Sequence, residues 1–207
     1  MTITYPLTLP THTGQMRVTF RQINAVASPM SPFTFVGQKQ VYPGQMWEID
    51  VELPPMFRSN AEKWIAWLVS LKGYGTFYLG DQLAKLPMGS ARDTDSISVK
   101  GDTSSGETLS IKGVPENQTG YLKAGDYVHT GNGNNRQLFK VLADVDTDGF
   151  GEATLDVWPD IRTSLEDGDS VTAQNAQGIF CLVDPIQSWS VNNVAKFGIT
   201  FSARESI

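Results

Sequence analysis

The chain of 207 residues is 40% apolar and 18% charged, an ordinary composition for a globular protein of one or two domains. Its net charge of −6 gives no general attraction to nucleic acid or to anionic membranes, and its single cysteine excludes an internal disulfide. No apolar run approaches the roughly 18 residues that a membrane-spanning helix needs, so we expect no membrane insertion.

Two segments within the first 45 residues predict extended arms. Residues 1–14 alternate loosely and contain two prolines, which is typical of an edge strand or an arm. Residues 28–45 form a longer apolar loop, in which Pro29, Pro32 and Pro43 exclude a regular central strand. Such a loop packs either on its own domain or on another subunit. The candidate subunit-contact residues in these segments are Tyr5, Leu7, Phe33, Phe35, Val41 and Tyr42.

A clear strand and the one clear helix come next. Residues 45–55 alternate between apolar and acidic side chains and predict a strand with one buried face. Residues 59–72 predict a helix in which Ser59 is the N-cap, Glu62 closes a capping box and Gly73 ends the last turn. One side of this helix is apolar and must lie on a large apolar surface, which we expect to be a sheet. That stripe consists of Ala61, Trp64, Trp67, Leu68 and Leu71.

The middle of the chain differs in charge and in pattern. Residues 92–177 contain seven basic and 15 acidic residues, a net charge of −8, whereas residues 1–91 have a net charge of +2. Six short strand patterns separated by turn signals follow one another here, which is typical of a small antiparallel barrel. The sequence therefore predicts a mainly β fold. A β-sandwich or barrel scaffold with one flanking helix (residues 1–91 plus 178–207) is interrupted by an inserted acidic β-barrel domain (residues 92–177).

One local motif suggests a metal site. The run DVDTDG copies the first half of an EF-hand calcium loop. Position twelve of such a loop requires a glutamate but is Leu155 here, and both flanks read as strands. A hairpin turn explains the same residues, so we expect neither a metal nor another cofactor. The candidate metal ligands, should a cation bind, are Asp144, Asp146, Asp148 and Glu152.

No catalytic constellation is evident. The two histidines, His12 and His129, are far apart in sequence, and the chain has no nucleophile signature. An aromatic sugar-binding platform from Tyr121, Tyr127 or Trp158 is an alternative to half-buried strand aromatics. By elimination we expect a binding or assembly protein and not an enzyme.

The order of several short motifs resembles a known family. P-G-x-x-W-E-x-x-V-x-L-P-P-M (residues 43–56) leads into a helix of the form A-x-x-W-x-x-x-L and then into G-x-G-T-F-x-L-G-D (residues 73–81). L-K-A-G-D-Y-V (residues 122–128), G-x-G-x-A-T-L-x-x-x-P-x-x-R (residues 149–162) and a closing F-x-I-T-F-x-A-R-E follow. In these motifs, which are spread over most of the chain, the sequence resembles minor tail proteins of long-tailed, siphovirus-type bacteriophages, in particular the distal tail or baseplate-hub type.

This resemblance implies a structural virion protein, made in the host cytoplasm, that forms a ring at the distal end of the phage tail. Such rings are commonly hexamers, so the partners would be further copies of this chain, the tail-tube protein and a central hub or tip protein. The family implies no catalytic residues, and its outward-facing accessory β-domain would correspond to residues 92–177. The alternative is a carbohydrate-binding or host-surface-binding tail module that acts through the inserted domain.

Overall fold

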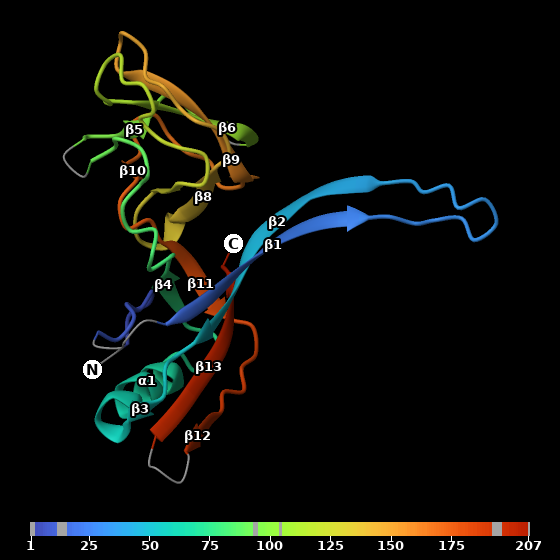
Figure 1. Cartoon of the computed structure of the whole chain (residues 1–207), viewed down its shortest axis with the longest axis vertical. Helices are drawn as coiled ribbons and strands as arrows, with labels where there is room; N and C mark the ends of the chain where they lie inside the picture. The colour runs from blue at the N-terminus through green and yellow to red at the C-terminus, as the bar shows by residue number, and fades with distance from the viewer. Residues whose placement is uncertain (1–2, 12–15, 93–94, 104, 192–195, 207) are drawn as a thin grey trace.

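The computed structural model describes residues 3–11, 16–92, 95–103, 105–191 and 196–206. Its strands form a seven-stranded and a six-stranded sheet, one above the other in Figure 1, and a long hairpin projects sideways between them. Within the described ranges, no helix has the length and the apolar character that crossing a membrane would require.

The first sheet combines strands from both ends of the chain. Its main order is β1-β2-β13-β11-β4 with antiparallel pairing, and β3 and β12 also pair with β13. The alternating apolar residues of β2, from Trp47 to Leu53, are buried as the sequence predicts. The strands are β1 (Arg17–Ala27), β2 (Gln40–Glu52), β3 (Met56–Phe57), β4 (Thr76–Leu79), β11 (Gly178–Leu182), β12 (Trp189–Val191) and β13 (Lys196–Glu205).

The helix α1 (Arg58–Ser70) covers the apolar face of this sheet. All five residues of the predicted stripe are buried, which confirms the predicted packing of the helix on a sheet. The Trp67 ring lies 4.9 Å from that of Phe77 and 5.8 Å from that of Phe201, measured between ring centroids. These aromatic contacts fix the helix against β4 and β13.

The start of the helix differs from the prediction. The N-cap is Phe57 and not Ser59, and none of the described side chains caps the first turn. The physical reason is that Phe57 belongs to β3, which pairs with β13, so the chain enters the helix directly from a paired strand. Glu62 pairs with Arg58 at 3.1 Å instead of closing a capping box. Gly73 has a φ of +75° in the turn after the helix, as expected for a left-handed stop.

The second sheet is a nearly closed barrel in the order β10-β7-β8-β9-β6-β5. A bridge between Ser98 of β5 and Ser170, next to β10, joins its two ends. The interior is a separate cluster of buried apolar residues. All six predicted strands are present, which confirms a mainly β fold with one helix and a small antiparallel barrel. They are β5 (Ser98–Val99), β6 (Gly106–Lys112), β7 (Tyr127–Thr130), β8 (Gln137–Val141), β9 (Glu152–Ile161) and β10 (Val171–Thr172).

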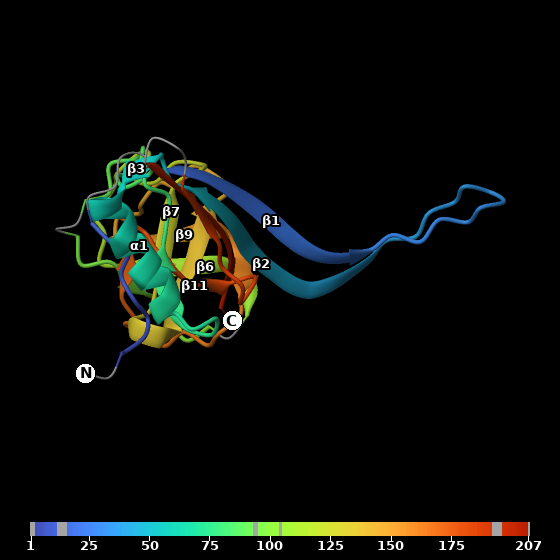
Figure 2. The same cartoon turned by 90° about the horizontal axis from the view of Figure 1, so that it is seen from below.

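The two sheets share part of their core. The chain enters the second sheet after β4 and returns to the first at β11. Tyr127, Leu138 and Trp158 come from the second sheet, yet they belong to the buried cluster of the first. Figures 1 and 2 show the hairpin of β1 and β2 leaving the molecule near this junction, on the side away from α1.

Candidate functional site: a projecting hairpin arm

The hairpin of β1 and β2 extends far beyond the rest of the first sheet (Figures 1 and 2). Strand β13 pairs with β2 only along residues 48–52, so the outer part of the hairpin is a two-stranded ribbon. We call residues 24–44 the arm and residues 30–37, which a bridge between Met30 and Gly37 closes, the arm tip.

The prediction of an irregular loop over residues 28–45 was wrong in part. Strand β2 already begins at Gln40 and contains Pro43. The pairing register shifts between Asn24 and Val26, which leaves Pro43 outside the regular ladder. A two-stranded ribbon tolerates a proline at such an irregularity, because the missing N–H is not required by a second neighbour.

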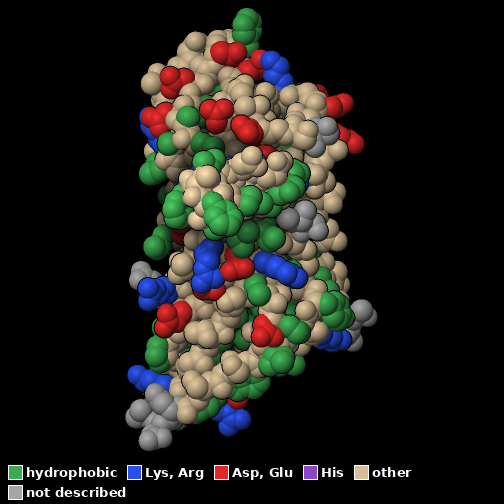
Figure 3. Space-filling model, turned by 90° about the vertical axis from the view of Figure 1, so that its right-hand side faces the viewer, with side chains coloured by type: hydrophobic (Ala, Val, Ile, Leu, Met, Phe, Trp, Pro, Cys, Tyr) green, Lys and Arg blue, Asp and Glu red, His purple; other side chains and the backbone are tan. Residues whose placement is uncertain are grey.

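The arm displays apolar side chains to solvent. Within residues 24–44 every residue except Ser31 is exposed, and Phe33 is 91% exposed. Residues 22–47 carry a single charge, Lys39, whereas a solvated surface is about a quarter to a third charged. Figure 3 views the molecule from the side of the arm, and hydrophobic side chains gather in the middle of this face. The exposed apolar residues of the arm are Val26, Met30, Phe33, Phe35, Val36, Val41 and Tyr42.

The arm tip is an ordered turn built around Ser31. The backbone N–H of Ser31 donates to the carbonyl of Val36 at 3.0 Å, and its carbonyl accepts the N–H of Phe35 at 2.9 Å. Its Oγ accepts the backbone N–H groups of Phe33 and Thr34 at 3.4 Å. Phe35 has a φ of +56°, a left-handed conformation that costs a non-glycine residue about 1–2 kcal/mol. The turn thus holds two phenylalanines outward at an energetic cost, which favours a functional role.

Aromatic contacts anchor the arm where the two sheets meet. The Trp47 ring packs edge-on against Trp158 of β9, with centroids 4.4 Å apart, and against Phe20 of β1 at 5.7 Å. The Nε1 of Trp47 donates to the carbonyl of Leu138 in β8 at 3.2 Å. The Nε1 of Trp158 donates to the side-chain oxygen of Asn24 at 3.1 Å. Both sheets therefore hold the base of the arm.

A buried ion pair lies beside these rings. Arg162 donates to the two carboxylate oxygens of Glu205 at 2.8 and 2.6 Å, and to the carbonyl of Gln45 at 2.9 Å. Glu205 also accepts the backbone N–H of Trp47 at 3.2 Å. The side chain of Glu205 is 2% exposed and that of Arg162 is 12% exposed. The pair ties the end of β13 and the segment after β9 to the base of the arm.

The two candidate contact residues near the N-terminus lie elsewhere. Leu7 forms a parallel bridge with Phe77 of β4, and Tyr5 donates from its hydroxyl to the carbonyl of Ser70 at 2.6 Å. The Tyr5 ring also packs edge-on against Tyr74 at 5.9 Å. This segment covers the β4 edge of the chain's own sheet, whereas the other four candidates lie on the arm.

The candidate calcium ligands form part of a hairpin turn. Asp144 and Glu152 pair with lysines, and Asp146 and Asp148 accept backbone N–H groups. The hydrogen bond from Lys123 lowers the pKa of Asp144. In the ranges that the structure describes, no group of three or more His, Cys, Asp or Glu residues is placed to hold a metal ion.

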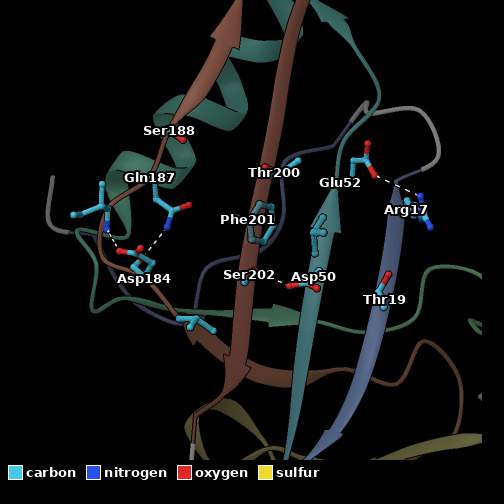
Figure 4. Close-up of a pocket in the computed structure, with 13 residues that line it drawn as sticks. Arg17, Thr19, Asp50, Glu52, Asp184, Gln187, Ser188, Thr200, Phe201 and Ser202 are labelled. Atoms are coloured by element: carbon cyan, nitrogen blue, oxygen red, sulfur yellow. Dashed lines mark hydrogen bonds and ion pairs between the residues drawn. The ribbon is translucent and has the colours of Figure 1, made fainter.

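An open groove of about 470 Å³ lies on the polar face of the first sheet (Figure 4). Glu52 pairs with Arg17 at 3.9 Å, and Asp50 accepts the hydroxyl of Ser202 at 2.6 Å. Asp184 accepts a backbone N–H within its own turn at 2.7 Å. Every carboxylate in this wall has a partner, and the described lining residues include no histidine or cysteine. Among the described lining residues, the groove therefore has no Ser–His or Cys–His pair.

The other described side chains that were considered for chemistry are buried. Burial and the nearby charge of Arg136 lower the pKa of His129 to about 3, so this histidine is neutral at physiological pH. His12 lies outside the described residues. The aromatic residues considered as a sugar-binding platform are core residues: Tyr121, Tyr127 and Trp158.

Comparison of the chain with protein-family models and with curated proteins finds no match to either. The arm is apolar, its tip is an ordered turn, and its apolar side chains are exposed in the described part of the chain. It is the candidate functional site.

Proposed function

We propose that the protein is a structural subunit of a ring at the distal end of a bacteriophage tail, in which the arm joins neighbouring copies. The observation that carries this proposal is the apolar, nearly uncharged arm. An isolated chain would gain nothing from displaying it to water. The motif order supports the tail assignment, because the motif of residues 43–56 covers the base of the arm and the strand that supports it.

The energetics favour contact with another protein surface. Moving one phenylalanine side chain from water into an apolar contact is worth about 1.5–3 kcal/mol. The arm tip presents Phe33 and Phe35 from a preformed turn, so docking them loses little conformational entropy. A closed ring repeats this contact at every subunit, and the contacts together stabilise the assembly.

The distribution of charge supports a ring in which the inserted domains face outward and the scaffold segments lie inside. The scaffold segments, residues 1–91 and 178–207, have net charges of +2 and 0, whereas residues 92–177 have a net charge of −8. Like charges on the inserted domains of neighbouring copies repel one another and favour an outward position. In this proposal the scaffold contacts the tail-tube protein and the central hub or tip protein. The alternative is an inserted domain that binds sugars. Its candidate platform of Tyr121, Tyr127 and Trp158 does not support it, because these aromatic residues are buried.

The test is the mass of the purified chain in solution, measured by light scattering over a range of concentrations. We expect a closed oligomer, with six copies the first expectation, that forms as the concentration rises. The double variant F33D/F35D should remain monomeric and fold normally, because aspartate adopts a positive φ more readily than phenylalanine. The matched control is F150D, because Phe150 is 87% exposed and lies in the inserted domain. This variant should assemble as the parent chain does. A parent chain that stays monomeric at every concentration would contradict the proposal.

A further inference from the structure

We infer that the loop of residues 83–88, here called the receiving loop, binds the arm tip of a neighbouring copy. This inference rests on the proposed function and names the surface that completes the contact. The occupant is a second copy of this chain, because the two surfaces match in chemistry and lie on opposite sides of one molecule.

The receiving loop has a fixed backbone. The carboxylate of Asp126 accepts the N–H groups of Met88 and Gly89 at 2.7 and 3.2 Å, and the Lys85 carbonyl accepts the N–H of Asn175 at 2.6 Å. The backbone approaches the second sheet so closely that a Cβ on Gly89 would lie 2.2 Å from the carbonyl oxygen of Tyr121. The loop is therefore held in place, and its outward side chains form a preformed surface.

The outward side chains of this loop are apolar. Leu83 is 86% exposed, Leu86 is 69% exposed and Met88 is 68% exposed, whereas Ala84 between them packs on the first core. Residues 82–91 contain one charge, Lys85. A surface loop with one charge and three large exposed apolar side chains has the composition expected of a contact.

The arm tip has the complementary character. Phe33 and Phe35 are rigid aromatic anchors on an ordered turn, and leucine and methionine side chains are good partners for them. The sulfur of Met88 offers a favourable contact at a ring edge. Neither surface brings a carboxylate that would be left without a partner on docking.

The positions of the two surfaces select the kind of assembly. In Figures 1 and 2 the arm extends to the right, whereas the green segment between β4 and β5, which contains the receiving loop, runs along the left side. The arm of one copy therefore reaches the receiving loop of the next copy and not its own. Repetition of such a head-to-tail contact produces a closed ring when the rotation between copies closes.

The first test mixes two defective chains. F33D/F35D keeps an intact receiving loop, and L83D/L86D keeps an intact arm tip. Each should be monomeric alone, and the equimolar mixture should form a particle of twice the monomer mass, because only one competent contact can form. Assembly of L83D/L86D in the manner of the parent chain would overturn the inference and leave the proposed ring intact.

The second test locates the contact by disulfide formation, in a Cys181→Ser background that removes the native thiol. A chain with F33C and L86C should cross-link between copies under mild oxidation, whereas the matched chain with F33C and F150C should not. Equal cross-linking in both chains, or none in an assembled F33C/L86C chain, would overturn the receiving loop. A parent chain that does not assemble and an F33C/L86C chain that does not cross-link would overturn both the loop and the ring.

Discussion

Glu205 is a charged residue at an inward position of an otherwise apolar strand. It follows Phe197, Ile199 and Phe201 in the alternation of β13 and is almost fully buried. A buried carboxylate requires a partner, and Arg162 provides two hydrogen bonds. The inward register of Glu205 can be seen in the sequence, and it predicts a buried partner. The identity of that partner cannot be seen, because Arg162 is 43 residues away and meets Glu205 only when both sheets are in place.

Arg162→Ala should destabilise the protein by about 3–5 kcal/mol, because it leaves the Glu205 carboxylate buried without its cation. Denaturant unfolding measures this loss. The double variant R162M/E205L should recover most of it, since an apolar pair needs no compensation. Arg58→Ala is the matched control: its partner Glu62 is exposed, and the change should stay within about 0.5 kcal/mol. An equal cost for Arg58→Ala and Arg162→Ala would show that burial of the pair is irrelevant.

His129 should make the protein less stable in acid. Its pKa is lowered from 6.5 to about 3 in the folded state, because the imidazole is buried and faces Arg136. Below pH 6.5 the unfolded chain therefore binds a proton that the folded chain does not, and stability falls by up to about 1.4 kcal/mol per pH unit down to about pH 3. Comparing unfolding free energies at pH 7 and pH 4.5 should show a smaller drop for His129→Gln. The same drop in both proteins would rule out this linkage.

At the scale of the element, one local sequence signal predicted helix α1 correctly and another did not. The 3.6-residue apolar period placed the buried stripe correctly, because burial is decided by the whole face of the helix. The capping box at Ser59 failed, because strand pairing of β3 with β13 decided where the helix begins. Tyr5 and Leu7 pack on their own chain because their segment pairs with the edge of β4, and their role as subunit contacts stays a prediction. The pattern of residues 1–14 is typical of an edge strand or an arm, but the strand with which it pairs depends on the tertiary arrangement.

Trp67→Ala should cost about 3–5 kcal/mol, the range measured for truncating a large buried aromatic side chain. The residue is 7% exposed and packs against Phe77 and Phe201, so its removal leaves a cavity between the helix and the sheet. Val69→Ala on the exposed side of the same helix should change the unfolding free energy by less than about 0.5 kcal/mol. Thermal or denaturant unfolding distinguishes the two, and similar costs would contradict the packing described for α1.

At the scale of the whole molecule, the sequence predicted the apolar and proline-rich character of the arm but not its shape. Composition marked Phe33, Phe35, Val41 and Tyr42 as contact candidates, and these residues lie together on the arm. The direction of the arm depends on Trp47, which contacts residues more than 90 positions later in the chain. Contacts of that separation exist only in the folded molecule, so no local pattern could reveal them.

Limited proteolysis should distinguish the exposed arm of the monomer from the covered arm of the assembled protein. Chymotrypsin should cut dilute protein first at Phe33 and Phe35, and cutting there should slow at concentrations at which copies assemble. Phe150 is an internal control, because it is equally exposed but lies outside the proposed contact. Fragments can be assigned by mass spectrometry. A cutting rate at the arm tip that does not change with concentration, while light scattering reports an oligomer, would exclude the arm from the interface.

Because the arm is anchored at the junction of the two sheets, a small rotation at its base produces a larger displacement of its tip. Gln45 lies eight residues beyond Gly37, the last residue of the arm tip, a length of about 26 Å at 3.3 Å per residue. A tilt of about 7° at the base would displace the tip by about 3 Å, close to the spacing of one strand residue. The angle at which Trp47, Arg162 and Glu205 hold the base of the arm therefore determines the position of the next subunit. The curvature of the assembly, and with it the number of subunits needed to close it, would be encoded in a few buried side chains far from any subunit contact.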